Sequence, residues 1–204
     1  MLTLILGGAR SGKSDLAVRL GRLHDGPVVF VATMEGADGE TRARIAAHRS
    51  ERPAAWRTIE EPLYAVEALR DAAPPGALVL FDCLTLWISN ALLAATPDPD
   101  AASPAAMEAG VAAALARVGD LLDWQAESAC DLAVVSNEVG MGVVPAYPLG
   151  RAFRDALGAA NRLVAARADR VYYLVAGLVL DARALGAVPL EAWTEAAADD
   201  PDPR

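Results

Sequence analysis

Lysine is almost absent from this sequence of 204 residues: Lys13 is the only one, and the other 17 of its 18 basic residues are arginines. Cysteine is also scarce, because the chain holds only Cys83 and Cys130. These two lie too far apart for the close spacing of a zinc site, so we expect two buried free thiols in a reducing compartment. The composition therefore argues against a fold built on disulfides or on cysteine-bound zinc.

Long apolar runs are missing too, although 54% of the residues are hydrophobic. None approaches the ~20 residues that span a bilayer, and Leu2 to Leu6 is too short for a signal-peptide core. A net charge of −9 argues against non-specific binding of nucleic acid, which needs a basic surface. We expect a cytoplasmic protein, built as one domain over residues 1–198 with a disordered acidic tail at 199–204.

What is present is a glycine-rich loop near the start of the chain. It follows the apolar run Leu2 to Leu6 and precedes Leu16 and Leu20 at helical spacing. A strand, a glycine loop and a helix in this order are the context of a Walker A phosphate loop. In such a loop Lys13 reaches the β- and γ-phosphates and the Ser14 hydroxyl binds Mg²⁺. The loop, called the phosphate loop below, is Gly7-Gly8-Ala9-Arg10-Ser11-Gly12-Lys13-Ser14.

Apolar runs alternate with helical patterns along the chain, which predicts an α/β fold with a mostly parallel sheet flanked by helices. Together with the phosphate loop this indicates a three-layer fold like that of P-loop NTPases. The expected strands are Thr3–Leu6, Val28–Thr33, Arg57–Ile59, Leu78–Asp82, Leu132–Ser136 and Val171–Val175. The expected helices are Ser14–Leu23, Gly39–Ser50, Leu63–Ala72 with Pro62 in its first turn, Leu84–Leu93, Pro104–Glu127 and Gly150–Ala168.

Two further patterns carry possible chemistry. Leu78–Asp82 is an apolar strand that ends in a carboxylate, as a Walker B strand does, so Asp82 is a second candidate ligand for Mg²⁺. On a helix, Arg44, His48 and Arg52 share one face, because they are four residues apart. Flanking arginines favour a neutral imidazole, which is a nucleophile, but on spacing alone a solvated cationic helix face is the preferred interpretation. His24 is expected at the C-terminal end of the first helix.

These and other stretches resemble the bifunctional adenosylcobinamide kinase/adenosylcobinamide-phosphate guanylyltransferase family of cobalamin biosynthesis. The likeness covers residues 3 to about 176, in the order that the family has. The matching stretches are the phosphate loop, Val31 to Thr33, Arg44 to His48, Arg52 to Thr58 with Glu60, Asp82 to Thr85, Val135 to Pro145, and Arg151 to Asp155 with Gly158 and Asn161.

The resemblance implies two reactions. A nucleoside triphosphate, ATP or GTP, first phosphorylates the hydroxyl of the aminopropanol arm of adenosylcobinamide. GTP then donates GMP to that phosphate through a guanylylated histidine, which gives adenosylcobinamide-GDP and pyrophosphate. His48 matches the guanylylated position, and Ala47 stands where some members have a second histidine. Family members are reported as homotrimers, so a homo-oligomer is expected here.

The resemblance also implies a set of nucleotide contacts beyond the phosphate loop. Glu60 is able to accept hydrogen bonds from N1–H and the 2-amino group of guanine, although a charged helix start is the alternative. Glu138 is open between a base for the substrate hydroxyl and a structural turn. Arg151, Arg154 and Asp155 are open between surface ion pairs and a subunit contact. The implied contacts are Ala32, Thr33, Met34, Arg49, Ser50, Glu51, Arg52, Glu60 and Asp82.

Two other functions fit the same residues. One is a phosphate-loop kinase that acts on another small hydroxyl compound, with His48 in a structural role only. The other is a nucleotide-binding switch without transferase chemistry. Only the bifunctional enzyme requires a covalent nucleotide on His48.

Overall fold

A computed structural model describes residues 1–34, 52–98 and 101–193 of the chain. Helices and strands alternate along these residues, as the hydrophobic patterns predict. The elements are β1 (Leu2–Gly7), α1 (Lys13–Leu23), β2 (Val28–Ala32), β3 (Arg57–Glu60), α3 (Ala65–Ala72), β4 (Leu78–Asp82), α4 (Leu84–Ala95), α5 (Pro104–Glu127), β5 (Asp131–Asn137), α6 (Pro148–Arg167), β6 (Arg170–Val175), β7 (Leu178–Asp181) and a 3-10 turn (Leu190–Ala192).

The described strands form one seven-stranded sheet in the order β3-β2-β4-β5-β1-β6-β7. All neighbouring pairs are parallel except β6 and β7, which form an antiparallel hairpin. The predicted mostly parallel α/β fold is therefore confirmed. Strand β5 lies between β1, which carries the phosphate loop, and β4, which ends at Asp82. Ligands of open parallel sheets bind at the carboxyl ends of the strands, where both of these groups are found.

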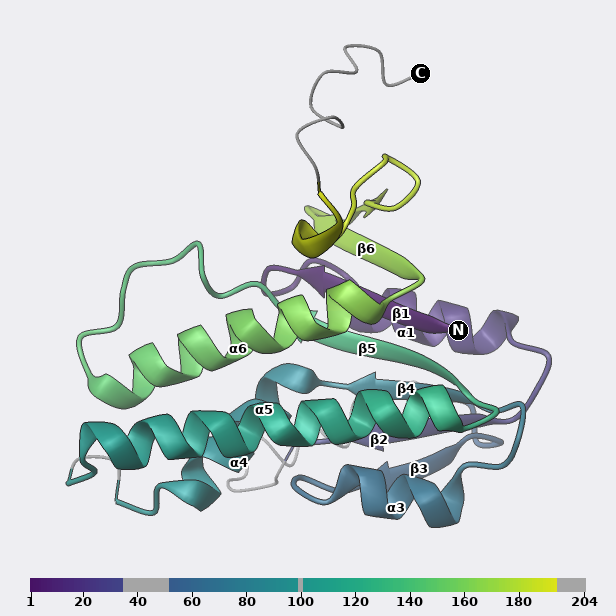
Figure 1. Cartoon of the computed structure of the whole chain (residues 1–204). Helices are drawn as coiled ribbons and strands as arrows, with labels where there is room; N and C mark the ends of the chain where they lie inside the picture. The colour runs from purple at the N-terminus through teal and green to yellow at the C-terminus, as the bar shows by residue number, and fades with distance from the viewer. Residues whose placement is uncertain (35–51, 99–100, 194–204) are drawn as a thin grey trace.

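Helices cover both faces of the sheet, which gives three layers (Figure 1). Alternate residues of β1 show the division: Leu2 and Leu4 pack with α3, α4, α5 and α6, whereas Ile5 packs with α1 on the opposite face. Because both faces are buried, the central strands are nearly continuous in apolar residues. The larger core contains Phe81 and Trp87, whose rings meet edge to face with centroids 5.1 Å apart. This contact fixes the start of α4 next to Asp82.

Most bounds agree with the sequence-based expectation to within two residues, and one of the differences moves a predicted residue out of its helix. Helix α3 begins at Ala65 rather than Leu63, so the prediction that Pro62 lies in its first turn is wrong. The Glu61 carboxylate accepts the backbone N–H groups of Leu63 and Tyr64, both at 2.9 Å, and holds this segment as a turn before the helix.

Strand β7 was not expected at all. It pairs with β6 across the two-residue turn Ala176-Gly177, in which both residues have positive φ, 50° and 80°. Tight hairpin turns of this kind usually carry Asn-Gly or Asp-Gly, so alanine at the first position hid the turn.

Some expectations fall outside the described residues: the helix Gly39–Ser50 and the acidic tail 199–204. The division into one domain over 1–198 stays a prediction. Within the part of the chain that the structure describes, no helix is both long and apolar enough to cross a membrane.

Candidate active site

The phosphate loop connects the end of β1 to the start of α1, as predicted. Its backbone needs glycine where it turns: Gly12, which precedes the helix, has φ 96°. At Gly7 a Cβ atom would lie 2.3 Å from the carbonyl oxygen of Leu174 in β6 and 2.9 Å from Ser11 Oγ. The loop is therefore pressed against the neighbouring strand, and a side chain at Gly7 would displace one of them.

Lys13 points back into the phosphate loop. Its side chain is only 8% exposed, and Nζ donates a hydrogen bond of 2.6 Å to the carbonyl oxygen of Gly8. Burial lowers the pKa of Lys13. Interactions with the Cys83 thiolate form and with the Asp82 carboxylate raise it, but by less. The ammonium thus lies inside the loop and interacts with the carboxylate of Asp82, as expected for a cation that binds phosphates beside a metal ligand.

Three of the implied nucleotide contacts form a row along the carboxyl edge of the sheet. Ala32 pairs with Asp82 of β4 on one side and with Glu60 of β3 on the other. The register places Gly7 beside Asn137, at the end of β5, and so continues this edge toward the phosphate loop. The predicted residues Glu60, Ala32 and Asp82 are therefore brought to the same edge as Lys13.

Thr33 is fully buried and holds two elements of this edge together. Its hydroxyl donates to the carbonyl oxygen of Cys83 (2.8 Å) and accepts from the Cys83 N–H (2.9 Å). The Asn90 amide donates to the carbonyl oxygens of Thr33 (2.8 Å) and Pro62 (3.2 Å). The Thr33 side chain thus positions the residues after Asp82, and its nucleotide contact stays a prediction, as does that of the neighbouring Met34.

Both cysteines are free thiols, as predicted, but only Cys130 is fully buried, whereas Cys83, next to Asp82, is half-buried. Burial, with the Asp82 carboxylate as a second cause, raises the pKa of Cys83 from 9.0 to about 11. The folded protein binds this proton more tightly than the unfolded chain does. The contribution of the protonated thiol to the free energy of unfolding is therefore complete below pH 9 and is lost as the pH rises from 9 to about 11.

We therefore predict slow alkylation of Cys83 by iodoacetamide at pH 8.5 in the folded protein. Followed by mass spectrometry as a function of pH, the rate should rise with an apparent pKa of about 11. The urea-unfolded protein supplies the control, with an apparent pKa near 9. A value near 9 in the folded protein would contradict the effect of the surrounding protein on this thiol.

Arg52 lies on the α1 side of the sheet. Its guanidinium carbon is 3.5 Å from the centre of the Phe30 ring, a stacking distance for a cation on an aromatic face. Trp56, four residues on, packs against α1, where a Cβ atom on Gly21 would lie 2.6 Å from the indole. The segment after residue 51 is thus anchored on the face that carries α1. His48, Arg49, Ser50 and Glu51 lie outside the described residues, so their predicted roles stay predictions.

The residues after β5 carry the two pairs of alternatives that the sequence leaves open, and these stay open. Glu138 accepts the N–H of Gly140 at 2.6 Å, which supports the structural turn rather than a base. Arg154 pairs with the adjacent Asp155 at 3.0 Å, as expected for a surface ion pair. Arg151 instead donates to the carbonyl oxygens of Pro145 (3.0 Å) and Ala146 (2.7 Å), and so holds the loop that precedes α6.

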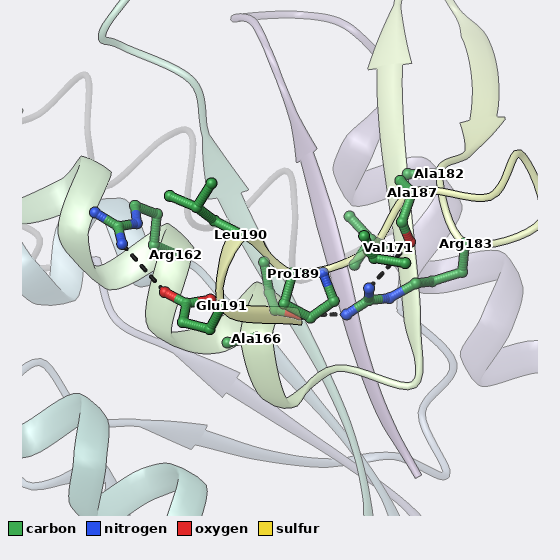
Figure 2. Close-up of a pocket in the computed structure, with 11 residues that line it drawn as sticks. Arg162, Ala166, Val171, Ala182, Arg183, Ala187, Pro189, Leu190 and Glu191 are labelled. Atoms are coloured by element: carbon green, nitrogen blue, oxygen red, sulfur yellow. Dashed lines mark hydrogen bonds and ion pairs between the residues drawn. The ribbon is translucent and has the colours of Figure 1, made fainter. Parts of the chain in front are cut away.

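A pocket of about 190 Å³ lies far from this edge. Figure 2 shows it between the end of α6 and the segment after β7. Val171, at the start of β6, lines it, so the pocket is at the amino end of the parallel strands, opposite the phosphate loop. The Arg183 guanidinium there donates to the carbonyl oxygens of Ala165 (2.8 Å) and Ala187 (3.1 Å). It ties the segment after β7 to α6, and the pocket lies away from the predicted nucleotide contacts.

Comparison with known proteins identifies the kind of enzyme to which this edge belongs. The family model described as "Cobinamide kinase / cobinamide phosphate guanyltransferase" matches residues 3–182. The chain belongs to this family. The resemblance deduced from the motifs is thereby confirmed, and with it the enzyme class: a transferase of the cobinamide kinase and guanylyltransferase kind.

Curated relatives of the family cover nearly the whole chain. The bifunctional adenosylcobalamin biosynthesis protein CobP of Pseudomonas aeruginosa is 43% identical over 178 residues, which are 87% of this chain and 95% of that protein. The protein CobU of Escherichia coli, with the same description, is 37% identical over 181 residues, 87% of this chain and 97% of that protein. A solved structure, from a study of an ATPase of the type III secretion system, has a TM-score of 0.49 at 15% identity. The superposition covers 93% of this chain and 59% of the ATPase chain, and the likeness is too weak to support a conclusion.

For a cobinamide kinase, the donor set at this edge fits a magnesium ion. Among the described residues no group of three or more histidine, cysteine, aspartate or glutamate side chains is placed to hold a metal by itself. A magnesium ion bound with a nucleotide needs only one or two protein ligands, because phosphates and water supply the rest. The hydroxyl of Ser14 and the carboxylate of Asp82, which interacts with the Lys13 ammonium, are oxygen donors of the kind that such an ion takes.

Proposed function

We propose that this protein carries out both reactions named by its family, at the carboxyl edge of the sheet. In the first, the hydroxyl of the aminopropanol arm of adenosylcobinamide attacks the γ-phosphorus of a nucleoside triphosphate. The hydroxyl loses its proton to solvent and the nucleoside diphosphate leaves. The observation that carries the proposal is the buried Lys13 ammonium inside the phosphate loop, close to Asp82, in a member of this family.

In the second reaction we propose His48 as the nucleophile. One imidazole nitrogen attacks the α-phosphorus of GTP and pyrophosphate leaves, which forms a phosphoramidate. A phosphate oxygen of adenosylcobinamide phosphate then attacks the same phosphorus, breaks the P–N bond and frees the histidine. The product is adenosylcobinamide-GDP.

In this proposal some residues of the edge bind the phosphates of the nucleotide and others bind its guanine. Lys13 exchanges its hydrogen bond with the Gly8 carbonyl for phosphate oxygens, and the N–H groups of the loop point at the same anion. Ser14 and Asp82 would hold Mg²⁺, which neutralises phosphate charge when bound. Glu60 is placed at the far end of the row, where a guanine edge would donate to its carboxylate. Ala32, Met34 and Arg52 complete the proposed contacts, together with Arg49, Ser50 and Glu51.

The test follows two labels into the corrinoid. The protein is incubated with adenosylcobinamide, Mg²⁺ and GTP labelled at either the γ- or the α-phosphate, and the corrinoid is isolated. We expect the γ-label to enter first and the α-label to follow, with one pyrophosphate released for each GMP transferred. Transfer of the γ-label alone would reduce the function to a kinase. Nucleotide binding without transfer of either label would favour a nucleotide-binding switch.

We also propose a cytoplasmic homo-oligomer, a trimer by family resemblance. Support comes from apolar side chains exposed on β7 and after it, which a second copy of the chain would cover. They include Leu178 (66% exposed), Leu185 (71%) and Trp193 (51%). A mass of one chain by light scattering at micromolar concentration would contradict the proposal.

A further inference from the structure

Buried polar side chains form a hydrogen-bond network that joins α6, β5 and α4, beside the first residue of the phosphate loop. Ser136 donates from its hydroxyl to Asn161 Oδ1 at 2.6 Å. Asn161 Nδ2 donates to the carbonyl oxygen of Asn137 at 3.1 Å, and the N–H of Asn137 donates to Thr85 Oγ1 at 3.0 Å. Ser136 is fully buried and Asn161 is 6% exposed.

The orientation of the Asn161 amide is fixed by its two partners. The Asn137 carbonyl only accepts, so it must face Nδ2, and the Ser136 hydroxyl then donates to the oxygen. The oxygen and the nitrogen of the amide are thus both hydrogen-bonded to the last two residues of β5. An apolar residue at position 161 would leave the Asn137 carbonyl without this donor, so the Asn161 amide holds the end of β5.

The network reaches the phosphate loop through one residue. Asn137 lies beside Gly7 in the sheet, and the next residue, Glu138, donates its N–H to the carbonyl oxygen of Gly7 at 3.2 Å. On the other side Gly7 is in close contact with the carbonyl of Leu174. The first residue of the loop is therefore held between β6 and the end of β5, and the position of that end is set by Asn161.

We propose that Asn161 is a positioning residue for the nucleotide site: by fixing Asn137 and Glu138 it sets the position of Gly7 and of the phosphate loop. Asn161 contacts neither nucleotide nor acceptor in this role. The inference rests on the proposed function only in that the loop binds a nucleoside triphosphate.

The experiment measures nucleotide affinity separately from stability. Calorimetric titration with Mg²⁺ and guanosine 5′-(β,γ-imido)triphosphate gives Kd, and urea unfolding gives the midpoint. Asn161→Ala removes both bonds. Asn161→Asp keeps the acceptor for Ser136 but loses the donor to Asn137. Ser136→Ala keeps the donor to Asn137 but removes the hydroxyl that donates to Asn161. Val164→Ala is the matched control, because Val164 is a fully buried residue of α6 outside the network.

We expect Asn161→Ala and Asn161→Asp each to raise Kd by about tenfold or more, since the Asn137 carbonyl loses its buried donor. Ser136→Ala should raise it by roughly threefold, and Val164→Ala should leave it unchanged while lowering the urea midpoint. Unchanged affinity in both Asn161 variants would overturn the proposal. So would an effect of Val164→Ala as large as theirs, which would mean that affinity follows stability alone.

Failure of the proposed function gives a different result. If the wild type binds the analogue and the Asn161 variants do not, but no label enters adenosylcobinamide, the positioning role stands and the bifunctional activity falls. If labels enter the corrinoid and the Asn161 variants bind like wild type, only the positioning role falls. A wild type that binds no nucleotide would overturn both.

Discussion

Replacing Lys13 by alanine is expected to lower the rates of both phosphoryl transfer and guanylyl transfer by about 10²- to 10³-fold. The physical reason is the position of the ammonium, which is buried in the phosphate loop next to Asp82 and is the only lysine in the sequence. Without Lys13, no buried cation in the phosphate loop stabilises the negative charge that develops on the phosphates in the transition state. The measurement is kcat for each labelled transfer at saturating GTP.

Two further variants make this result specific. Arg19→Ala removes one positive charge from the exposed side of the same helix and should leave both rates unchanged. Lys13→Arg keeps the charge but replaces a compact ammonium by a planar guanidinium, which does not fit the 2.6 Å contact with the Gly8 carbonyl, so it should be nearly as impaired as the alanine variant. Activity of Lys13→Ala within a few-fold of wild type would remove the loop from the mechanism.

Replacing His48 by alanine is expected to abolish the covalent guanylyl label and to spare the kinase reaction. An alanine side chain has no nucleophilic atom, so it cannot form the covalent intermediate. The protein is incubated with Mg²⁺ and α-labelled GTP, denatured and analysed for bound label, which should be labile in acid and stable in alkali, as a phosphoramidate is. Phosphorylation of adenosylcobinamide by the same variant is measured in parallel.

The sequence offers a matched control, since His24 is its only other histidine. His24 ends α1 as predicted, and its Nε2 lies 3.0 Å from the carbonyl oxygen of Gly76. Gly76 precedes the first residue of β4, so this contact is at the end of the sheet opposite the nucleotide edge. His24→Ala should keep the full label. Label that persists in His48→Ala would assign the nucleophile elsewhere, and loss of the kinase reaction as well would give His48 a structural part in the nucleotide site.

Local signals in the sequence were sufficient for most of the fold. Strand Leu78–Asp82 and helix Pro104–Glu127 have the bounds that their patterns predict. The helix carries its own start signal: Pro104 occupies the first turn, and Ser103 Oγ accepts the N–H of Ala106 at 3.2 Å. The phosphate loop was equally predictable, because its glycines, lysine and serine stand at fixed spacing between an apolar strand and a helical pattern, all within one short stretch.

The order of the strands and the network around Asn161 were not predictable in this way. Periodicity shows that a residue is in a strand, but it does not show which strand lies next to it, so the placement of β5 between β1 and β4 emerges only in three dimensions. Asn161 stood out only as part of a family motif, since a single polar residue on a helix gives no sign that its partners are Ser136 and Asn137. The contact of Arg52 with Phe30 is equally non-local.

The pairing of β1 also has a consequence for how the protein is made. Leu2–Gly7 pairs only with β5 and β6, whose first residues are Asp131 and Arg170. At about 5–20 residues per second, a ribosome needs several seconds or more between β1 and the first of these partners. The segment that leads into the phosphate loop is thus among the first to be synthesised and among the last to find its place in the sheet. Nascent chains shorter than about β6 should be unable to bind nucleotide, so GTP in the cell meets a competent site only when synthesis of the domain is nearly complete.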